Sequence, residues 1–211
     1  DRAAGDFFGY SVAISGTTVV VGANQEDEGA GSAYIFSRDQ GGSNNWGQVK
    51  KLVASDRANS DYFGRSVAIS GTTIVVGAYQ EDQDAAGGNT LDDAGSAYVF
   101  SQDQGGSNNW GQVKKLVASD RAADDQFGGS VAISGTTVVV GAYQEDEDAA
   151  GLNNVSEAGS AYFFEGTEPC SNPTAYNVTG SGAYCTGGTG VAVGLANSET
   201  GVTYQLKDAS N

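Results

Sequence analysis

The sequence contains no histidine and no methionine, and only two of its 211 residues are cysteine. Without histidine it cannot build a Ser–His or Cys–His pair or a histidine-ligated metal site from its own residues. Basic residues are also scarce, because 10 Lys and Arg stand against 26 Asp and Glu, which gives a formal net charge of −16. So negative a protein repels phosphate backbones, and we expect no nucleic-acid binding.

Long apolar runs are missing as well. No stretch of about 18 apolar residues could form a membrane span. The chain starts at Asp1 without a methionine or a signal peptide, so we take it as a mature protein or a piece of one. Its two cysteines, Cys170 and Cys185, lie in a stretch rich in Gly, Ser and Thr that offers little core. We expect a disulfide, which implies export to an oxidising compartment; two buried free thiols are the alternative.

What the chain does contain is a repeat. FGYSVAISGTTVVVGA at 8–23 recurs as FGRSVAISGTTIVVGA at 63–78 and as FGGSVAISGTTVVVGA at 127–142. The copies define units of about 1–55, 56–119 and 120–165, followed by a tail at 166–211. Unit length varies in one acidic loop only, which is shorter in the first unit, so this loop is expected to project from a fixed scaffold.

Each unit is expected to form four short strands. In the first unit these are 11–15, 17–23, 31–36 and 46–54, which are rich in Val, Ile, Thr, Tyr and Phe and bounded by Gly, Asn, Asp and Ser. No helical periodicity competes, so the predicted fold class is all-β.

The apolar pattern predicts how the sheets pack. VVV at 19–21 and AYIF at 33–36 are apolar on both faces, whereas a sheet with one solvated face would alternate. Stacked four-stranded blades, as in a β-propeller, would cover both faces. The fourth strand carries paired lysines, and we expect it to be an exposed outer edge that the lysines protect from pairing. These lysines are Lys50, Lys51, Lys114 and Lys115.

The third unit ends after SAYFF at 160–164, and no counterpart of WGQVKKLVA follows. The start of the chain aligns with the start of the later units, so we expect a KKLVAS-like strand to precede Asp1. Three blades are too few to close a propeller. Further repeats upstream, several chains sharing one ring, and an open solenoid all remain as explanations.

The signature FG-x-SVAIS…VVVGA…GSAY-[IVF]-F resembles the FG-GAP repeat, known from integrin α-subunit propellers and from bacterial surface proteins. The bacterial form is the more similar one. The resemblance covers residues 1–165 and implies β-propeller blades. Integrin-type repeats often hold calcium in a DxDxDG loop between the first two strands. Here that place reads only SGTT, as at 15–18, so the integrin calcium site is not carried over.

The tail at 166–211 is predicted to be a short β-rich segment containing the disulfide. Residues 176–208 resemble the opening of Ig-like adhesin modules in secreted Bacteroidetes surface proteins. An Ig-like sandwich needs about 100 residues. The tail is therefore either the start of such a module or a segment that packs onto the last blade.

The acidic loops are candidate calcium sites, because calcium takes six to eight oxygen ligands and clustered carboxylates supply them. Their spacing does not match an EF-hand, and a solvated acidic turn is the alternative. The candidate ligands are Glu81, Asp82, Asp84, Glu145, Asp146 and Asp148.

Four aromatic residues are candidate contacts for a sugar or a protein partner: Tyr79, Tyr143, Trp46 and Trp110. Packing at blade edges is the alternative for each. Every acidic cluster is repeated, whereas an active site normally breaks repeat symmetry, so we expect no enzyme. The favoured hypothesis is a non-enzymatic, extracellular adhesion module of a large bacterial surface protein that binds a protein, glycan or surface. The alternative is a spacer or filament subunit that assembles with further repeats or chains.

Overall fold

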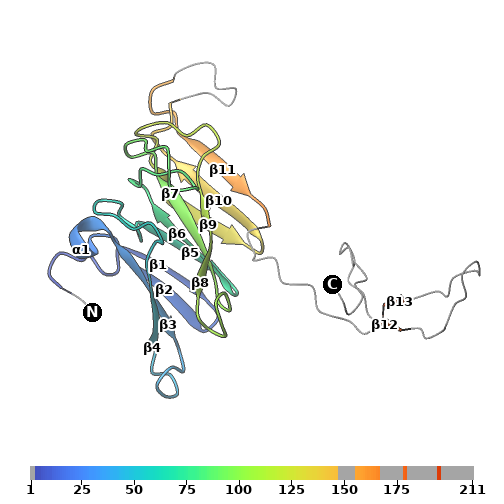
Figure 1. Ribbon diagram of the computed structural model, residues 1–211. Helices are drawn as coiled ribbons and strands as arrows, with labels where there is room; N and C mark the ends of the chain where they lie inside the picture. Colours follow the sequence, from blue (N-terminus) through green and yellow to red (C-terminus); the bar gives the residue numbers. More distant parts are fainter. Residues whose placement is uncertain (1–2, 147–154, 167–177, 180–193, 196–211) are drawn as a thin grey trace, which may run out of the picture. The chain divides into compact units, whose positions relative to one another are not determined.

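The computed structural model describes residues 3–146, 155–166, 178–179 and 194–195. The chain divides into two units, Asp1–Pro169 and Cys170–Asn211. In the first unit, three antiparallel sheets of four, four and three strands follow one another in chain order (Figure 1). In the second unit, β12 (Val178–Thr179) pairs with β13 (Gly194–Leu195). The all-β prediction is confirmed for the described residues.

Within each sheet, neighbouring strands are also neighbours in the sequence. Sheet 1 consists of β1 (Ser11–Ser15), β2 (Thr18–Ala23), β3 (Ser32–Ser37) and β4 (Gly47–Leu52). Sheet 2 consists of β5 (Ser66–Ser70), β6 (Thr73–Ala78), β7 (Ser96–Ser101) and β8 (Gly111–Leu116). Sheet 3 consists of β9 (Phe127–Ser134), β10 (Thr137–Ala142) and β11 (Ser160–Phe164). No fourth strand pairs with sheet 3 among the described residues, and residues 167–177, which follow β11, lie outside them.

One helical turn, α1 (Glu26–Gly29), interrupts the β structure. It forms in the acidic loop of the first unit, the shortest of the three. The amide of Gly29 donates to the carbonyl of Gln25 at 3.1 Å, and the amide of Gly31 donates to the carbonyl of Glu26 at 2.9 Å. The short connection is closed by these local hydrogen bonds, which the sequence pattern did not reveal.

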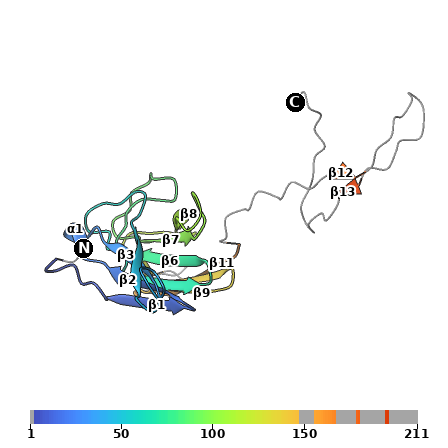
Figure 2. The same cartoon turned by 90° about the horizontal axis from the view of Figure 1, so that it is seen from below.

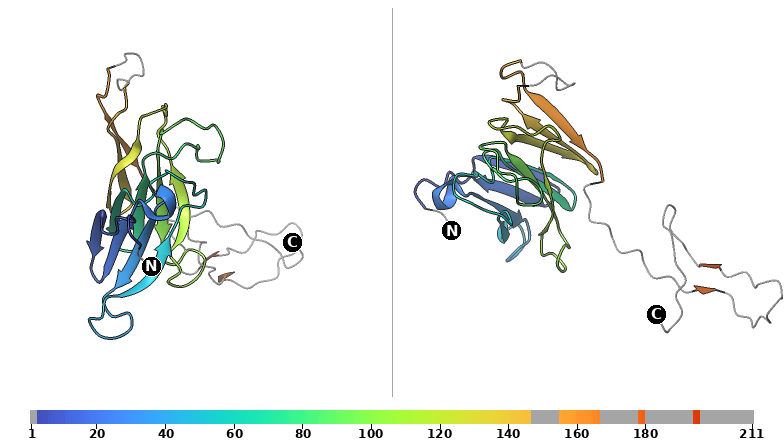
Figure 3. Two further views of the ribbon diagram at one scale, coloured as in Figure 1. Left: turned by 90° about the vertical axis from the view of Figure 1, so that its left-hand side faces the viewer. Right: turned by 45° about the horizontal axis from the view of Figure 1, so that its top comes forward.

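The sheets stack face to face, and the hydrophobic core lies between them (Figure 2). Every residue of β6 and β7 is buried, so the prediction of sheets covered on both faces is confirmed for sheet 2. Strand β11 alternates between half-buried and exposed residues, because one face of sheet 3 has no neighbour among the described residues. The three sheets form a staggered stack (Figure 3), and no closed propeller is formed by the described part of the chain.

The repeated start of the second and third units anchors each of them to the sheet before. Phe63 is fully buried and forms a parallel bridge with Gly31. The hydroxyl of Ser11 donates to the carbonyl of Gly64 at 2.7 Å. A Cβ atom at Gly22 would lie 2.1 Å from that same carbonyl oxygen, so the approach requires glycine. We call the paired residues Phe63–Gly64 the Phe-Gly segment, and the surface around Gly22 and Gly31 the glycine groove.

The same arrangement recurs between sheets 2 and 3. The Phe-Gly segment is Phe127–Gly128, and it lies in the groove around Gly77 and Gly95. A Cβ atom at Gly77 would lie 2.0 Å from the carbonyl oxygen of Gly128, and the hydroxyl of Ser66 donates to that oxygen at 2.8 Å. Two interfaces in one chain therefore have the same construction.

The expectation that the paired lysines protect an exposed edge is wrong for the second lysine of each pair. The side chain of Lys115 is only 5% exposed, and that of Lys51 is 29% exposed. Register explains this, because Lys115 lies opposite the buried Tyr98 and Lys51 lies opposite Tyr34. A bulge in the fourth strand sets that register. Lys114 remains exposed, as expected.

Candidate functional site

The acidic loops and the linkers between sheets lie at the same edge, which we call the loop edge. It contains the loops 24–31, 79–95 and 143–159, of which 147–154 lie outside the described residues. Each linker contacts the loop of the sheet before it. Arg57 pairs with Asp27 at 2.6 Å, and Arg121 donates to the carbonyl of Asn89 at 2.8 Å. The loop edge is thus held together across neighbouring units.

The first acidic residue of each loop is buried rather than presented to solvent. Glu26, Glu81 and Glu145 are 4%, 1% and 3% exposed. Glu26 accepts hydrogen bonds from the hydroxyl of Tyr34 at 2.8 Å and pairs with Lys51 at 2.6 Å. The hydroxyls of Ser96 and Ser160 donate to Glu81 and Glu145, each at 2.6 Å. These carboxylates tie the loops to the strands beneath them.

In sheet 2, a second carboxylate, that of Asp56, joins the buried glutamate Glu81. The ammonium of Lys115 lies 2.7 Å from Glu81 and 2.7 Å from Asp56. The hydroxyl of Tyr98 donates to Asp56 at 2.8 Å, so one linker, one loop and two strands meet at this point. Sequence reasoning missed this network, although the order Asp, Glu, Tyr and Lys, which the first two units share, could have indicated it. We call Asp56, Glu81, Tyr98 and Lys115 the lysine network.

The other candidate calcium ligands already accept hydrogen bonds from the protein. Asp84 accepts the backbone amides of Ala86 and Gly88, both at 2.9 Å. Asp82 accepts the amide of Asp93 at 2.9 Å, and Asp146 accepts the amide of Glu157 at 2.6 Å.

Asp148 lies outside the described residues. Within the described ranges, no three carboxylates converge in a group that could hold a metal ion. The described residues alone therefore do not fit a calcium ion, and calcium binding stays a prediction for the complete loops.

Each linker also contains a buried aspartate that caps its own turn, as expected for such turns. Asp61 accepts the amide of Ala58 at 2.6 Å, and Asp125 accepts the amide of Ala122 at 2.7 Å. Burial raises the pKa of Asp61 to about 7 and that of Asp125 to about 6, against the opposing effect of these amide hydrogen bonds. Neighbouring carboxylates, with Glu81 foremost for Asp61, add to the increase in pKa.

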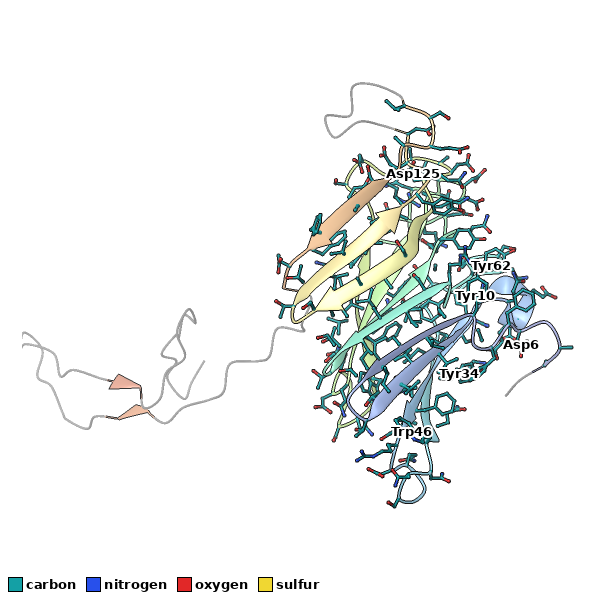
Figure 4. The ribbon with its side chains drawn as sticks, turned by 180° about the vertical axis from the view of Figure 1, so that it is seen from behind. Asp6, Tyr10, Tyr34, Trp46, Tyr62 and Asp125 are labelled. Atoms are coloured by element: carbon teal, nitrogen blue, oxygen red, sulfur yellow. The ribbon has the colours of Figure 1, made fainter. Side chains whose placement is uncertain are left out.

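An aromatic cluster with one exposed ring, Tyr10, and three half-buried members lies at the loop edge. The guanidinium of Arg65 lies 4.7 Å from the ring centroid of Tyr10 and 5.1 Å from that of Tyr79. The rings of Tyr79 and Tyr62 are 5.5 Å apart. Tyr10 and Tyr62 lie on the same side of the molecule in Figure 4. We call Tyr10, Tyr62, Arg65 and Tyr79 the tyrosine cluster.

The structure separates the aromatic candidates that the sequence grouped together. Tyr79 joins the tyrosine cluster, and Tyr143 lies 54% exposed on the loop edge of sheet 3. Trp46 is 39% exposed and lies at the far end of sheet 1 from Tyr10 (Figure 4). Trp110 is only 3% exposed and belongs to the core between sheets 1 and 2, so it presents no ring to a partner.

Three members of the tyrosine cluster were not among the sequence candidates. Tyr10 and Arg65 occupy the variable position directly after the Phe-Gly pair, and Tyr62 directly precedes it. That variability within otherwise identical copies was the available signal. The predicted disulfide cannot be placed, because Cys170 and Cys185 lie outside the described residues. Among the described residues, no helix is long and apolar enough to cross a membrane.

Comparison with known families gives one match. A family model described as the FG-GAP repeat matches residues 1–36, 46–100 and 110–164, which is more than half of the chain. The first range contains β1–β3, the second contains β4 of sheet 1 with β5–β7 of sheet 2, and the third contains β8 of sheet 2 with β9–β11 of sheet 3. No curated protein matches the chain.

Proposed function

Because the chain belongs to the FG-GAP repeat family, we propose that it is a non-enzymatic, extracellular binding module that recognises a partner through its loop edge. FG-GAP repeats are commonly extracellular modules of the binding or adhesion type. The finer proposal is adhesion by a large bacterial surface protein, with a protein or glycan as the partner.

The tyrosine cluster is the observation that carries this proposal. Tyr10 is 47% exposed although it contacts Arg65. Tyrosine and arginine are enriched among residues that dominate binding energy, because they combine a large contact area with hydrogen-bonding groups. Arg65 holds Tyr10 and Tyr79 in place before binding, which lowers the entropy lost on association. A partly exposed, pre-ordered aromatic surface is suited to sugar rings or to apolar side chains of a protein.

The charge of the loop edge supports the same proposal. The loop beside the cluster contains Asp82, Asp84, Asp92 and Asp93, and the chain as a whole carries a net charge of −16. An acidic rim favours partners with a positive surface and increases their rate of encounter. The buried glutamates and the lysine network fix the loops that carry this rim, so the surface is presented on a rigid support.

The test is a binding screen of the 211-residue chain on arrays of glycans and of extracellular proteins. Changing Tyr10→Ala together with Tyr79→Ala should weaken binding to any hit by at least about tenfold. Trp46→Ala is the matched control, because it removes an exposed aromatic ring at the opposite end of sheet 1. Binding that survives the tyrosine changes but is lost with Trp46→Ala would refute the assignment to the loop edge.

A further inference from the structure

The outer face of sheet 3 carries a copy of the glycine groove that no described residue of another unit fills. In sheets 1 and 2 the groove holds the Phe-Gly segment of the next unit. In sheet 3 the corresponding glycines are Gly141 and Gly159. Among the described residues, a Cβ atom at Gly141 would closely approach the side chain of Ser130 alone, at 2.4 Å, and no other unit. A hollow of about 440 Å³ lies here, lined by residues that include Ser130, Gly141, Gly159 and Ala161.

The residues around this groove correspond to residues that are buried between sheets in the first two units, but here they are exposed. Phe163 of β11 is 71% exposed, whereas its counterparts Val99 and Ile35 are fully buried. A second, smaller hollow of about 130 Å³ is lined by residues that include Val139, whose counterpart Val75 is fully buried. The same chemistry that packs sheet 2 against sheet 3 is therefore available on the far side of sheet 3.

Sheet 1 carries the complementary element on its own outer face. Its Phe-Gly segment is Phe8–Gly9, and Gly9 is exposed where Gly64 and Gly128 are buried. Val12 and Ile14 of β1 are 66% and 65% exposed. Their counterparts in β5, Val67 and Ile69, pack into the core between sheets 1 and 2. The described chain thus presents a groove at one end and the segment that fits it at the other.

We propose that these two faces bind each other between copies of this chain, with Phe8–Gly9 of one copy in the groove of Gly141 and Gly159 of a second. The hydroxyl of Ser130 would donate to the carbonyl of Gly9, as Ser11 and Ser66 donate to Gly64 and Gly128. The occupant is inferred from the two interfaces already present in the chain. Such a contact joins different faces, so repeated contacts build a ring if the rotation closes and a fibre if it does not.

Two variants should block one face each and leave the fold intact. Gly141→Ala places a methyl group where the incoming carbonyl must lie, and within its own sheet the methyl meets only the movable side chain of Ser130. Ile14→Asp puts a charge on the other face at a position that is already 65% exposed. Val53→Asp is the control, since Val53 is 41% exposed and lies outside both faces.

The experiment is sedimentation velocity of the 211-residue chain over a range of concentrations. About 0.3 M NaCl is needed to screen the repulsion between acidic copies. The unmodified chain and Val53→Asp should associate as concentration rises, and each blocking variant should weaken association by at least about tenfold. A mixture of Gly141→Ala with Ile14→Asp should give a dimer and stop there, since it pairs the one intact groove with the one intact segment.

Other outcomes overturn the proposal. A monomeric unmodified chain would show that another occupant, such as residues 170–211 of the same chain, covers these faces or that they stay open. Association that survives both blocking variants would place the contact elsewhere. A mixture that fails to dimerise, although the unmodified chain associates, would show that like faces pair with each other. None of these results depends on the ligand of the loop edge, so the proposed function can stand or fall separately.

Discussion

The lysine network gives the sharpest test of how the loops are anchored. Changing Lys115→Met keeps most of the side-chain volume and removes the charge that lies 2.7 Å from both Glu81 and Asp56. The side chains of these two acids are 2% and 18% exposed, so water cannot replace the lost ammonium at Glu81. Removing one partner of a buried ion pair typically costs about 3–5 kcal/mol.

Remaining contacts limit the cost, because Ser96 still donates to Glu81 and Tyr98 still donates to Asp56. We expect a loss of about 4 kcal/mol in the free energy of unfolding, near the middle of that range. With a urea dependence of about 2 kcal/mol per molar, the midpoint should fall by about 2 M. The assay is urea unfolding followed by circular dichroism.

The neighbouring lysine provides the matched control. Lys114 is exposed on the same strand, and Lys114→Met should change stability by less than about 0.5 kcal/mol. Adding Glu81→Gln to Lys115→Met should recover part of the loss, because the buried charge is then gone as well. If Lys115→Met costs no more than Lys114→Met, the lysine does not bind the loop to the sheet and the anchoring account is wrong.

Three further predictions concern protons, calcium and the tryptophans. Burial raises the pKa of Asp61 to about 7, against about 4 in an unfolded chain, so its contribution to stability is present at low pH and is lost as pH rises from 4 to 7. Asp61→Asn should flatten that pH dependence in urea unfolding and stabilise the protein above pH 7. Burial raises the pKa of Asp125 to about 6, so Asp125→Asn should flatten the pH dependence below about pH 6 and stabilise the protein above it. An unchanged pH profile would contradict both predictions. If the loops bind calcium, EDTA should lower the melting temperature relative to that in calcium buffer. Equal melting temperatures in the two buffers would refute the calcium hypothesis. Acrylamide should quench Trp46, 39% exposed, in Trp110→Phe, and should hardly quench Trp110, 3% exposed, in Trp46→Phe; equal quenching would contradict the stacking.

The strands and their stacking could be predicted from the sequence because both depend on local pattern. Runs such as Val19–Val21 and Ala33–Phe36 are apolar on both faces, and such a sheet must be covered on both sides. The repeat then identifies the neighbouring units as the cover. The sequence also shows that the third unit differs from the others, because the segment WGQVKKLVA has no counterpart after Phe164.

The inward lysines could not be predicted, because their direction depends on a bulge. The register shifts between Ile35 and Phe36: Lys50 lies opposite Ile35, and Gln48 lies opposite Phe36. Val49 therefore has no residue opposite it in β3. One residue of slip moves every side chain to the other face of the sheet. Composition alone cannot show where that slip occurs.

The two tryptophans show a second limit of sequence reasoning. Trp46 and Trp110 occupy the same segment, GGSNNWGQ, and the chain gives them identical neighbours. Only Trp110 is covered, because it packs against residues of sheet 1 such as Ile35 and Val49. Exposure here is set by position in the stack, and local sequence carries no information about it.

The central claim is that the units hold together by placing each Phe-Gly segment in the glycine groove of the sheet before. Unfolding of three equivalent alanine variants, Gly22→Ala, Gly77→Ala and Gly141→Ala, tests it most directly. A Cβ atom at Gly22 or Gly77 would lie 2.1 or 2.0 Å from a backbone carbonyl oxygen of the next unit, whereas at Gly141 it would meet only the side chain of Ser130. The first two variants should lose several kcal/mol or fail to fold, and Gly141→Ala should remain near the unmodified chain. Equal losses in all three would show that each glycine serves its own sheet, and the stacked architecture would be contradicted.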